Sequence, residues 1–425
     1  MTANKACWIK NVRLEQGFAT EDGVVVGTET TLNNVYMEAG KITRVEAVGG
    51  SSRLAGDVPV PVQYEESTQQ EGVPHFDAQG LLMLPAFKEM HIHIDKTYYG
   101  GPWKAVRPAA SIFDRFAEER ELLPKQVPTA RHRAEKMLEL MLGYGATHIR
   151  THCNVDPIIG LQNMEATLQA LDTYAGKLSA EIVAFPQHGL LLSDSVQRVR
   201  EAMRMGATHV GGVDPATVDG NIDKSLHTIM EIAVEANAGV DIHIHERDHL
   251  GIYSMRKLAE LTEQAGWQGR VTVSHAFGFA GVAAGVAGEL AARFAELDIN
   301  VTSTIPIGAI QMPIPLLREK GVRVELGNDS ITDHWSPFGT GDMLEKANRM
   351  AELYRYADEL SLARALECIT GGITPLNESG QQVWPAVGAE ANAVFVEASC
   401  SAEAVARRSP RRAVMYQGKV VAGSL

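Results

Sequence analysis

The sequence contains four polar segments whose residue types can bind a metal ion. His91 and His93 are separated by one residue, so in a strand both imidazoles point to the same side. His243, His275 and Asp329 follow later, each in or directly after a short apolar run. Imidazole nitrogens and a carboxylate that converge on one point suit zinc or iron. These residues therefore predict a divalent-metal site, provided that the fold brings them together.

The positions of these segments strengthen the interpretation, because a His-x-His pair alone is a weak signal. Two histidines on a strand can simply be hydrogen-bonded structural residues. All four segments, however, end separate predicted strands, and chance would rarely place them so. We expect the other histidines near these segments to be structural or to support the ligands from behind: His148, His152, His188, His209, His245 and His249.

The elements that must position these residues are short apolar runs that alternate with helical segments. This alternation is typical of α/β folds. Eight runs favour a (β/α)₈ barrel of the TIM type over an open doubly wound sheet, and a barrel carries its active site at the C-terminal ends of its strands. The runs cover residues 82–84, 146–150, 181–185, 208–213, 240–244, 271–273, 299–302 and 322–326, and helical periodicity is clear in residues 130–142, 195–205, 225–236 and 254–265.

Both ends of the chain have the character of strands and turns rather than helices. Branched apolar residues alternate with polar ones in residues 24–48, and residues 392–396 and 413–421 are similar. We therefore expect a small β-sandwich domain formed by residues 1–80 and 376–425, beside a barrel formed by residues 81–375. The arginines at positions 407, 408, 411 and 412 are expected on the solvated surface of that small domain.

Composition and charge exclude several classes of protein. The 425 residues are 45% hydrophobic and carry a net charge of −13, so no basic surface is available for duplex nucleic acid or anionic lipid. No segment reaches the ~20 apolar residues of a membrane span, and the start of the chain has no signal-peptide core. We expect a cytoplasmic protein that binds neither nucleic acid nor membranes, with its four scattered cysteines reduced and buried.

The polar segments together resemble the amidohydrolase superfamily and, within it, the bacterial cytosine deaminase-like group. The resemblance covers nearly the whole chain. Residues 211–217, with the region from Gly251 to Ala276, also resemble enzymes that hydrolyse amino groups from s-triazine rings. The segments that carry the resemblance are residues 85–96 with the run His-Ile-His-Ile-Asp-Lys, residues 150–152, Phe185-Pro186-Gln187, residues 243–246, Ser274-His275, and Asn328-Asp329 followed by Trp335, Pro337 and Gly339.

The resemblance implies a ligand set and a reaction. His91, His93, His243 and Asp329 would bind one divalent ion, zinc or iron. Two-metal relatives have a carboxylated lysine at the end of the fourth strand, where this chain has residues 211–214, so a single ion is expected. The implied activity is hydrolysis of a carbon–nitrogen bond in a cyclic amidine. Asp329 would accept a proton from the attacking water, and His275 would orient this water.

The remaining site residues implied by the resemblance contact the substrate. Glu246 would carry the proton to the ring nitrogen, because attack on an aromatic carbon requires protonation of its neighbour. Gln187 both donates and accepts hydrogen bonds, which matches a ring edge with C=O and N–H groups such as that of cytosine. Trp335 would cover the ring face. Ser330 stands where cytosine deaminases have a second aspartate, which leaves room for a methyl group at ring position C5.

The expected function is thus deamination of a free pyrimidine base, cytosine or 5-methylcytosine, to uracil or thymine and ammonia. The first alternative is hydrolysis of an amino-substituted s-triazine of the ammelide type, or of another cyclic amidine such as creatinine. Glu246 favours the pyrimidine, since the triazine enzymes carry an aspartate there. The alternative from another class is a catalytically silent binding barrel. Members of the family assemble, so a homo-oligomer is expected.

Overall fold

A barrel of eight parallel strands forms the centre of the computed structural model, which describes residues 6–48, 53–54 and 73–425. The strands follow one another around the barrel in sequence order. The first and last strands meet through a parallel bridge between Ile92 and Asp329. The expected (β/α)₈ fold is therefore confirmed. The strands are β7 (Phe87–Ile92), β8 (Ala146–Asn154), β9 (Ser179–Phe185), β10 (His209–Val213), β11 (Gly239–His243), β12 (Val271–Ser274), β13 (Ile299–Ser303) and β14 (Val324–Leu326).

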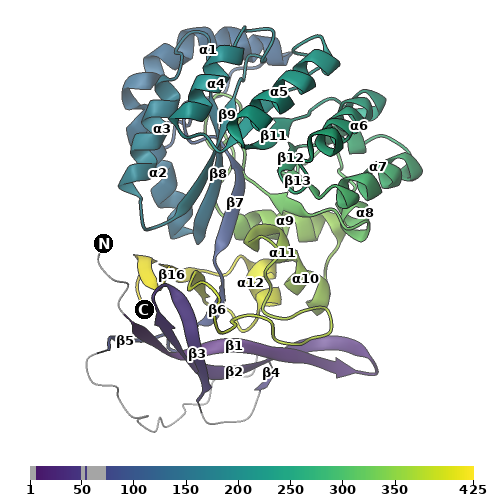
Figure 1. Ribbon diagram of the computed structural model, residues 1–425. Coiled ribbons are helices and arrows are strands. Elements are labelled where there is room, and N and C mark those ends of the chain that lie inside the picture. Colours follow the sequence, from purple (N-terminus) through teal and green to yellow (C-terminus); the bar gives the residue numbers. More distant parts are fainter. Residues whose placement is uncertain (1–5, 49–52, 55–72) are drawn as a thin grey trace.

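Helices cover the outside of the barrel because its strands are buried on both faces (Figure 1). Apolar side chains of α5 (Ile222–Ala236) and α6 (Asp248–Ala265) pack on the strands at the three-to-four-residue spacing seen in the sequence. The other helices are α1 (Ile112–Gln126), α2 (Ala130–Gly143), α3 (Gln162–Thr173), α4 (Val196–Met205), α7 (Ala284–Glu296), α8 (Ile314–Glu319), α9 (Met343–Tyr354), α10 (Glu359–Ala365), α11 (Glu367–Thr370) and α12 (Ser401–Arg407).

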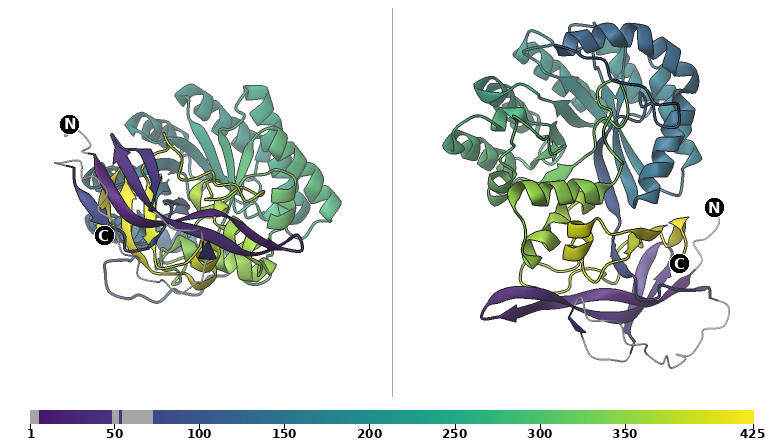
Figure 2. Two further views of the ribbon diagram at one scale, coloured as in Figure 1. Left: turned by 90° about the horizontal axis from the view of Figure 1, so that it is seen from below. Right: turned by 180° about the vertical axis from the view of Figure 1, so that it is seen from behind.

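A second sheet combines strands from both ends of the chain, as expected from the sequence. Its nine strands are hydrogen-bonded into one continuous sheet, with the main order β17-β16-β15-β6-β1-β2-β3. Figure 2 shows this sheet across one end of the barrel. Its strands are β1 (Cys7–Glu21), β2 (Val24–Glu38), β3 (Lys41–Ala47), β4 (Arg53–Leu54), β5 (His75–Asp77), β6 (Leu82–Pro85), β15 (Ala393–Val396), β16 (Arg411–Tyr416) and β17 (Lys419–Gly423). Residues 1–5, 49–52 and 55–72 of the expected small domain lie outside the described residues.

One expected barrel strand belongs to the other sheet. The apolar run at residues 82–84 forms β6, which pairs antiparallel with β15 in the nine-stranded sheet. The first barrel strand is instead β7, two residues later. The two strands are hard to distinguish in the sequence because both are buried on both faces. The chain passes between the sheets at Pro85 and Ala86, where the Ala86 amide donates to the Asn392 carbonyl.

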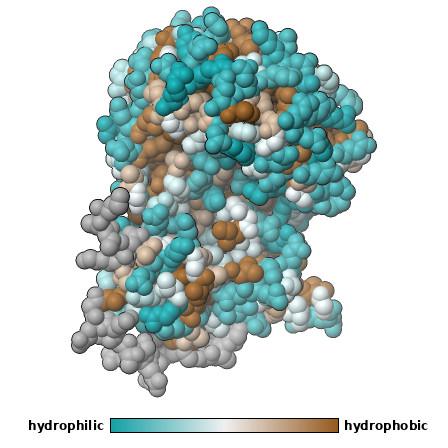
Figure 3. All heavy atoms as spheres, viewed as in Figure 1, coloured by the Kyte–Doolittle hydropathy of each residue, from teal (hydrophilic) through white to brown (hydrophobic). Residues whose placement is uncertain are grey.

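The direction of β7 places the candidate site at the end of the barrel away from the nine-stranded sheet. The strand leaves that sheet and runs into the barrel, so the C-terminal ends of the parallel strands lie at the far end (Figure 1). The barrel face seen in Figure 3 is mostly hydrophilic, with apolar residues in small groups. Among the described residues, no helix has the length and apolar character needed to cross a membrane. All four cysteines are buried and unpaired, as expected.

All four arginines near the C-terminus were expected on the surface, and for Arg411 this expectation is wrong. Arg407 and Arg412 are exposed, but the side chain of Arg411 is 4% exposed. Its guanidinium contacts Asp342 at 2.5 Å. Asp342 also accepts a hydrogen bond from the Leu344 amide at the start of α9. Arg411 therefore connects the nine-stranded sheet to a helix of the barrel through a buried ion pair.

Replacing Arg411 with Met should destabilise the protein strongly, because it leaves the buried Asp342 carboxylate without its partner. Loss of one partner of a buried pair costs about 3–5 kcal/mol. Arg412→Met is the matched control, since Arg412 is exposed and its loss should change the unfolding free energy by less than about 1 kcal/mol. Urea unfolding measures both. Adding Asp342→Asn to the Arg411 variant should restore part of the loss. Equal unfolding free energies for the two single variants would contradict this role of Arg411.

Candidate active site

The four predicted metal ligands converge at the C-terminal end of the barrel. His91 and His93 come from the end of β7, His243 ends β11, and Asp329 follows β14. One potential ligand atom from each lies within 4.8 Å of those of the others. The Nε2 atoms of His91 and His93 are 3.4 Å and 3.2 Å from Oδ1 of Asp329. Three buried histidines thus meet a partly exposed aspartate that is more than two hundred positions away from His91 and His93 in the sequence.

The protonation states of His93, His243 and Asp329 suit a divalent cation. Burial lowers the pKa of His93 to about 3 and that of His243 well below its usual value, so both imidazoles are neutral. Burial alone would raise the pKa of Asp329, but the neighbouring imidazoles of His91 and His93 bring it well below the usual value. Neutral imidazoles and an ionised carboxylate are the forms that bind metals.

Contacts behind the ligands orient the histidine rings. Nδ1 of His93 donates to the His152 carbonyl at 3.0 Å. Nδ1 of His91 lies 2.8 Å from Oγ of Ser274, whose hydroxyl donates to Asp241 at 2.6 Å. The Ser274 oxygen is therefore left to accept from His91. Both rings then direct an unprotonated Nε2 towards Asp329. Such outer contacts are what fixes the tautomer of a metal-binding histidine.

Unpartnered nitrogens complete the fit to a metal ion. Nε2 of His91 and both ring nitrogens of His243 are buried and have no hydrogen-bond partner among the described residues. Buried polar atoms in native proteins nearly always have a partner, and a cation would supply one here. The donor set of three imidazoles and one carboxylate therefore fits one divalent ion.

His275 lies beside the ligands and is suited to interact with water. Its Nε2 is 3.9 Å from Oδ2 of Asp329, and neither ring nitrogen has a partner among the described residues. Burial lowers the pKa of His275 well below its usual value, so its imidazole is neutral and can accept a hydrogen bond. His275 and Asp329 both have left-handed backbone conformations, with φ of 68° and 62°. These side chains leave their strand ends at unusual angles, into the mouth of the barrel.

A cavity of about 750 Å³ opens above the metal-binding cluster. Its inner wall includes His93, His243, His275 and Asp329. The three residues predicted to contact the substrate, Gln187, Ser330 and Trp335, also line it. The structure thus brings the predicted ligands and the predicted substrate residues to one cavity.

Lys96 is a cavity residue that the sequence analysis missed. Its side chain is 1% exposed, and its Nζ donates to Oε1 of Gln187 at 2.6 Å. Nζ also lies 5.2 Å from the centre of the Trp335 ring. The position of Lys96 in the sequence could have predicted this role, because Lys96 ends the polar run that follows β7. A lysine is almost never fully buried unless it has a partner.

Glu246 lies close to the cavity but is not among the residues that line it. Its Oε1 accepts from the backbone amides of Ala216 and Thr217 at 2.7 Å and 2.9 Å, and its Oε2 accepts from Ser254 at 2.7 Å. Burial raises the pKa of its carboxyl group. The carboxylate is therefore held by the loop after β10, and its predicted role as proton carrier remains a prediction.

His245, which the sequence analysis placed among the supporting histidines, lines the cavity instead. Its Nδ1 is 2.9 Å from Oδ2 of Asp214, which leaves Nε2 for a ligand. Burial alone would lower the pKa of His245, but the Asp214 charge raises it above its usual value. The sequence feature that could have predicted this position of His245 is Asp214, an acidic residue directly after a strand of the barrel.

Comparisons with known proteins agree with this geometry. Residues 75–422 match the model of the amidohydrolase family. The chain belongs to the amidohydrolase family. It is 44% identical, over 98% of this chain and 88% of the relative, to "Uncharacterized protein YahJ" of Escherichia coli K12.

Two solved structures show what kinds of enzyme resemble this family member. N-isopropylammelide isopropylaminohydrolase from Burkholderia multivorans is 31% identical, with a TM-score of 0.82 and 99% of each chain covered. 5-Methylcytosine deaminase from Klebsiella pneumoniae is 25% identical, with a TM-score of 0.77 and 98% of each chain covered. Membership of the family supports a hydrolase that acts on carbon–nitrogen bonds, and the buried histidine and aspartate set can bind its divalent metal.

Metal content should separate the ligands from the residue that acts on water. His243→Asn removes a ligand, so the purified protein should lose most of its bound metal. His275→Asn should retain about one ion per chain and lose activity by ~10²–10⁴-fold, because it removes only the group that orients the attacking water. Elemental analysis and circular dichroism of both variants test this expectation. Metal loss in the His275 variant would make His275 a ligand, and full metal content in the His243 variant would exclude His243.

Proposed function

We propose that this amidohydrolase removes an amino or alkylamino group, by hydrolysis, from a free six-membered heterocycle that carries oxo groups. The proposal includes a cytoplasmic location and assembly into a homo-oligomer. The single observation that carries it is the common cavity above the four predicted ligands, whose wall contains Lys96, Gln187 and Trp335. These side chains supply hydrogen-bond donors and an aromatic surface, which suit a flat polar ring.

The reaction assigns separate tasks to the residues of the inner wall. A bound divalent ion lowers the pKa of a water molecule to about 7 and so supplies hydroxide at neutral pH. His275 is placed to accept a hydrogen bond from the attacking water and the second oxygen of Asp329 to accept its proton. The departing amine would receive that proton from Asp329 when the carbon–nitrogen bond breaks. Attack on the ring carbon requires a proton at the neighbouring ring nitrogen. On geometry, His245 is better placed than Glu246 to deliver it, because His245 lines the cavity and Glu246 does not.

The contact between Lys96 and Gln187 favours a ring edge that presents two hydrogen-bond acceptors. Oε1 of Gln187 already accepts from the Lys96 ammonium, so the amide NH₂ and the other ammonium protons are left for the ligand. From the sequence, Gln187 was expected to accept a hydrogen bond from an N–H group of cytosine, which its contact with Lys96 disfavours. An oxo group beside a deprotonated ring nitrogen offers two acceptors and a negative charge. A dioxo ring of the ammelide type is therefore the leading substrate class.

Cytosine and 5-methylcytosine form the second substrate class. The similarity to the Klebsiella pneumoniae enzyme supports it. Ser330, directly after the predicted ligand Asp329, lines the cavity and is short and uncharged. A methyl group at ring position C5 would fit beside a serine better than beside an aspartate.

A substrate panel tests the ring class. Purified metal-loaded protein is assayed for ammonia or amine release from ammelide, N-alkylammelides, cytosine, 5-methylcytosine and creatinine. We expect the highest kcat/KM for a dioxo triazine. Lys96→Met should lower that value roughly 10–150-fold, since a hydrogen bond to a charged group contributes about 1.5–3 kcal/mol. Lys125→Met, at an exposed lysine on α1, is the control and should have little effect. Turnover of cytosines alone, unchanged by Lys96→Met, would contradict the proposed ring edge.

The ratio of the two cytosine substrates tests the role of Ser330. Ser330→Asp adds bulk and charge next to the predicted metal ligand, so it should lower kcat/KM for 5-methylcytosine relative to cytosine. Pocket discrimination of one methyl group is about 1–3 kcal/mol, which corresponds to roughly 10–200-fold. An unchanged ratio would mean that another part of the cavity wall determines the space at C5.

A further inference from the structure

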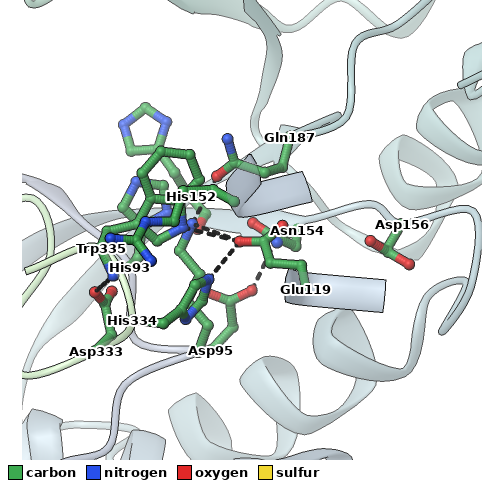
Figure 4. A network of polar contacts seen from close by, with 12 residues as sticks. His93, Asp95, Glu119, His152, Asn154, Asp156, Gln187, Asp333, His334 and Trp335 are labelled. Atoms are coloured by element: carbon green, nitrogen blue, oxygen red, sulfur yellow. Dashed lines mark hydrogen bonds and ion pairs between the residues drawn. The ribbon is translucent and has the colours of Figure 1, made fainter. Parts of the chain in front are cut away.

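A buried carboxylate behind the cavity wall gathers donors from several loops. Glu119 lies on α1, in the long connection between β7 and β8, and its side chain is fully buried. Its Oε2 accepts from His188 at 2.8 Å. Its Oε1 accepts from His334 at 2.7 Å and from the Trp335 indole at 2.9 Å, and lies 3.9 Å from Nζ of Lys96. We call these residues the Glu119 cluster: Glu119, Lys96, His188, His334 and Trp335. Figure 4 labels three of them, Glu119, His334 and Trp335.

The members of the Glu119 cluster come from different strand ends of the barrel. Lys96 follows β7, His188 follows β9, and His334 and Trp335 follow β14. Loops can take many conformations, so a carboxylate that accepts hydrogen bonds from two of them and forms an ion pair with a third restricts their relative positions. The helix that carries Glu119 is itself held in place, because Phe116 packs in a cluster with Phe185 and Val218.

The spacing of Glu119, His188 and Asp156 would also permit a metal ion, but the contacts indicate a different role. Asp156 lies 3.3 Å from Nδ1 of His188. Both oxygens of Glu119, however, already accept hydrogen bonds from ring nitrogens, and a lysine ammonium lies close by. A cation at this point would have to displace these donors. The contacts therefore describe a carboxylate that organises hydrogen-bond donors.

The negative charge of Glu119 is maintained in spite of burial. Burial alone would raise the pKa of its carboxyl group, but the Lys96 charge and the hydrogen bonds from His188 and His334 lower it well below the usual value. A charged acceptor forms stronger hydrogen bonds than a neutral one. The ionised carboxylate is also the nearest counter-charge to Lys96, whose side chain is almost completely buried.

We infer that Glu119 is a positioning residue for substrate binding. It holds the Trp335 ring on the cavity wall and keeps the Lys96 ammonium against Gln187, and it does not line the cavity itself. The inference rests on the proposed function, in which Lys96 and Trp335 contact the ring. Without the carboxylate, the indole N–H has no acceptor and the ammonium has no counter-charge, so both side chains lose their fixed positions.

The test compares Glu119→Gln with Glu121→Gln, which makes the same change at an exposed position on the same helix. The Glu119 variant should retain its metal and its fold. Its KM for the ring substrate should rise at least tenfold while kcat changes less than threefold, since the metal ligands are untouched. Glu119→Asp keeps the charge but reaches fewer donors, so its KM should lie between those of the wild type and the Gln variant. The Glu121 variant should match the wild type.

Trp335 fluorescence provides a measurement that does not depend on turnover. The emission of Trp335 is obtained by subtracting the spectrum of the matching Trp335→Phe protein. Glu119→Gln should shift this emission and raise its quenching by acrylamide at least twofold. If the wild type hydrolyses no ring in the panel, the proposed function fails, and the Trp335 emission still decides whether Glu119 positions this residue.

Three results would overturn the inference. The first is a Glu119→Gln protein with wild-type KM and unchanged Trp335 emission. The second is a variant that only loses thermal stability, with KM unchanged, which would show a purely structural role. The third is loss of the metal, which would place the action of Glu119 at the ligands. If Glu119→Gln fails to fold, Glu119→Asp provides the same measurements, and wild-type KM and emission in that variant would also overturn the inference.

Discussion

The closure of the barrel between β7 and β14 is the constraint on which the site depends. The Asp329 amide donates to the His91 carbonyl at 2.7 Å, and the His93 amide donates to the Asp329 carbonyl at 3.2 Å. Backbone hydrogen bonds thereby connect the predicted ligands at the ends of the first and the last strand of the barrel. Gly327 makes this approach possible, because a Cβ atom there would lie 2.5 Å from Cβ of His91. Any larger residue at this position would separate the two strands and, with them, the predicted metal ligands.

Buried charge is tolerated around this seam because each charged group has a partner in a second layer. On one side, Arg150 contacts Asp241 at 3.0 Å, and Asp241 accepts from the Ser274 hydroxyl that orients His91. On the other side, Glu119 balances Lys96. An unpaired charge in either place would cost several kcal/mol. The rigidity of the ligands and that of the substrate wall thus have a common origin, which is the requirement that buried charges be paired.

The sequence predicted the barrel and the metal-binding cluster well because both depend on local patterns. Strand periodicity and the fold's placement of active sites at strand ends predicted that the polar segments meet, and the resemblance to the amidohydrolase superfamily selected His91 and Asp329 as ligands. Local patterns gave a wrong prediction where two different environments have the same sequence pattern. The run at residues 82–84 is buried in either sheet, so hydrophobicity could not assign it. Arg411 looks like its exposed neighbours, and only the position of Asp342 shows that it is buried.

Side-chain direction after a strand end was the feature that the sequence could not provide. Glu246 and His245 are adjacent, yet the loop after β10 captures Glu246 through two backbone amides while Asp214 holds His245 at the cavity. That outcome depends on the path of residues 214–217, for which no periodic pattern exists. Glu119 was equally hidden, because a glutamate on an amphipathic helix is usually solvated.

The division between a rigid metal centre and a wall made of loops also explains how similar barrels can act on different rings. The ligands belong to strand ends whose geometry follows from barrel closure, so they can change little. In the proposed function, Lys96 and Gln187 would contact the ring edge and Trp335 the ring face, and all three lie on segments beyond the strands. In this chain those segments are connected to one carboxylate on α1, which is not required for the barrel to close. A change in α1 could therefore alter which ring is bound without disturbing the chemistry at the metal. The two similar structures, named for an alkylammelide and for a methylated cytosine, are consistent with such a separation, since their names share a ring amine as the reacting group and differ in the ring itself.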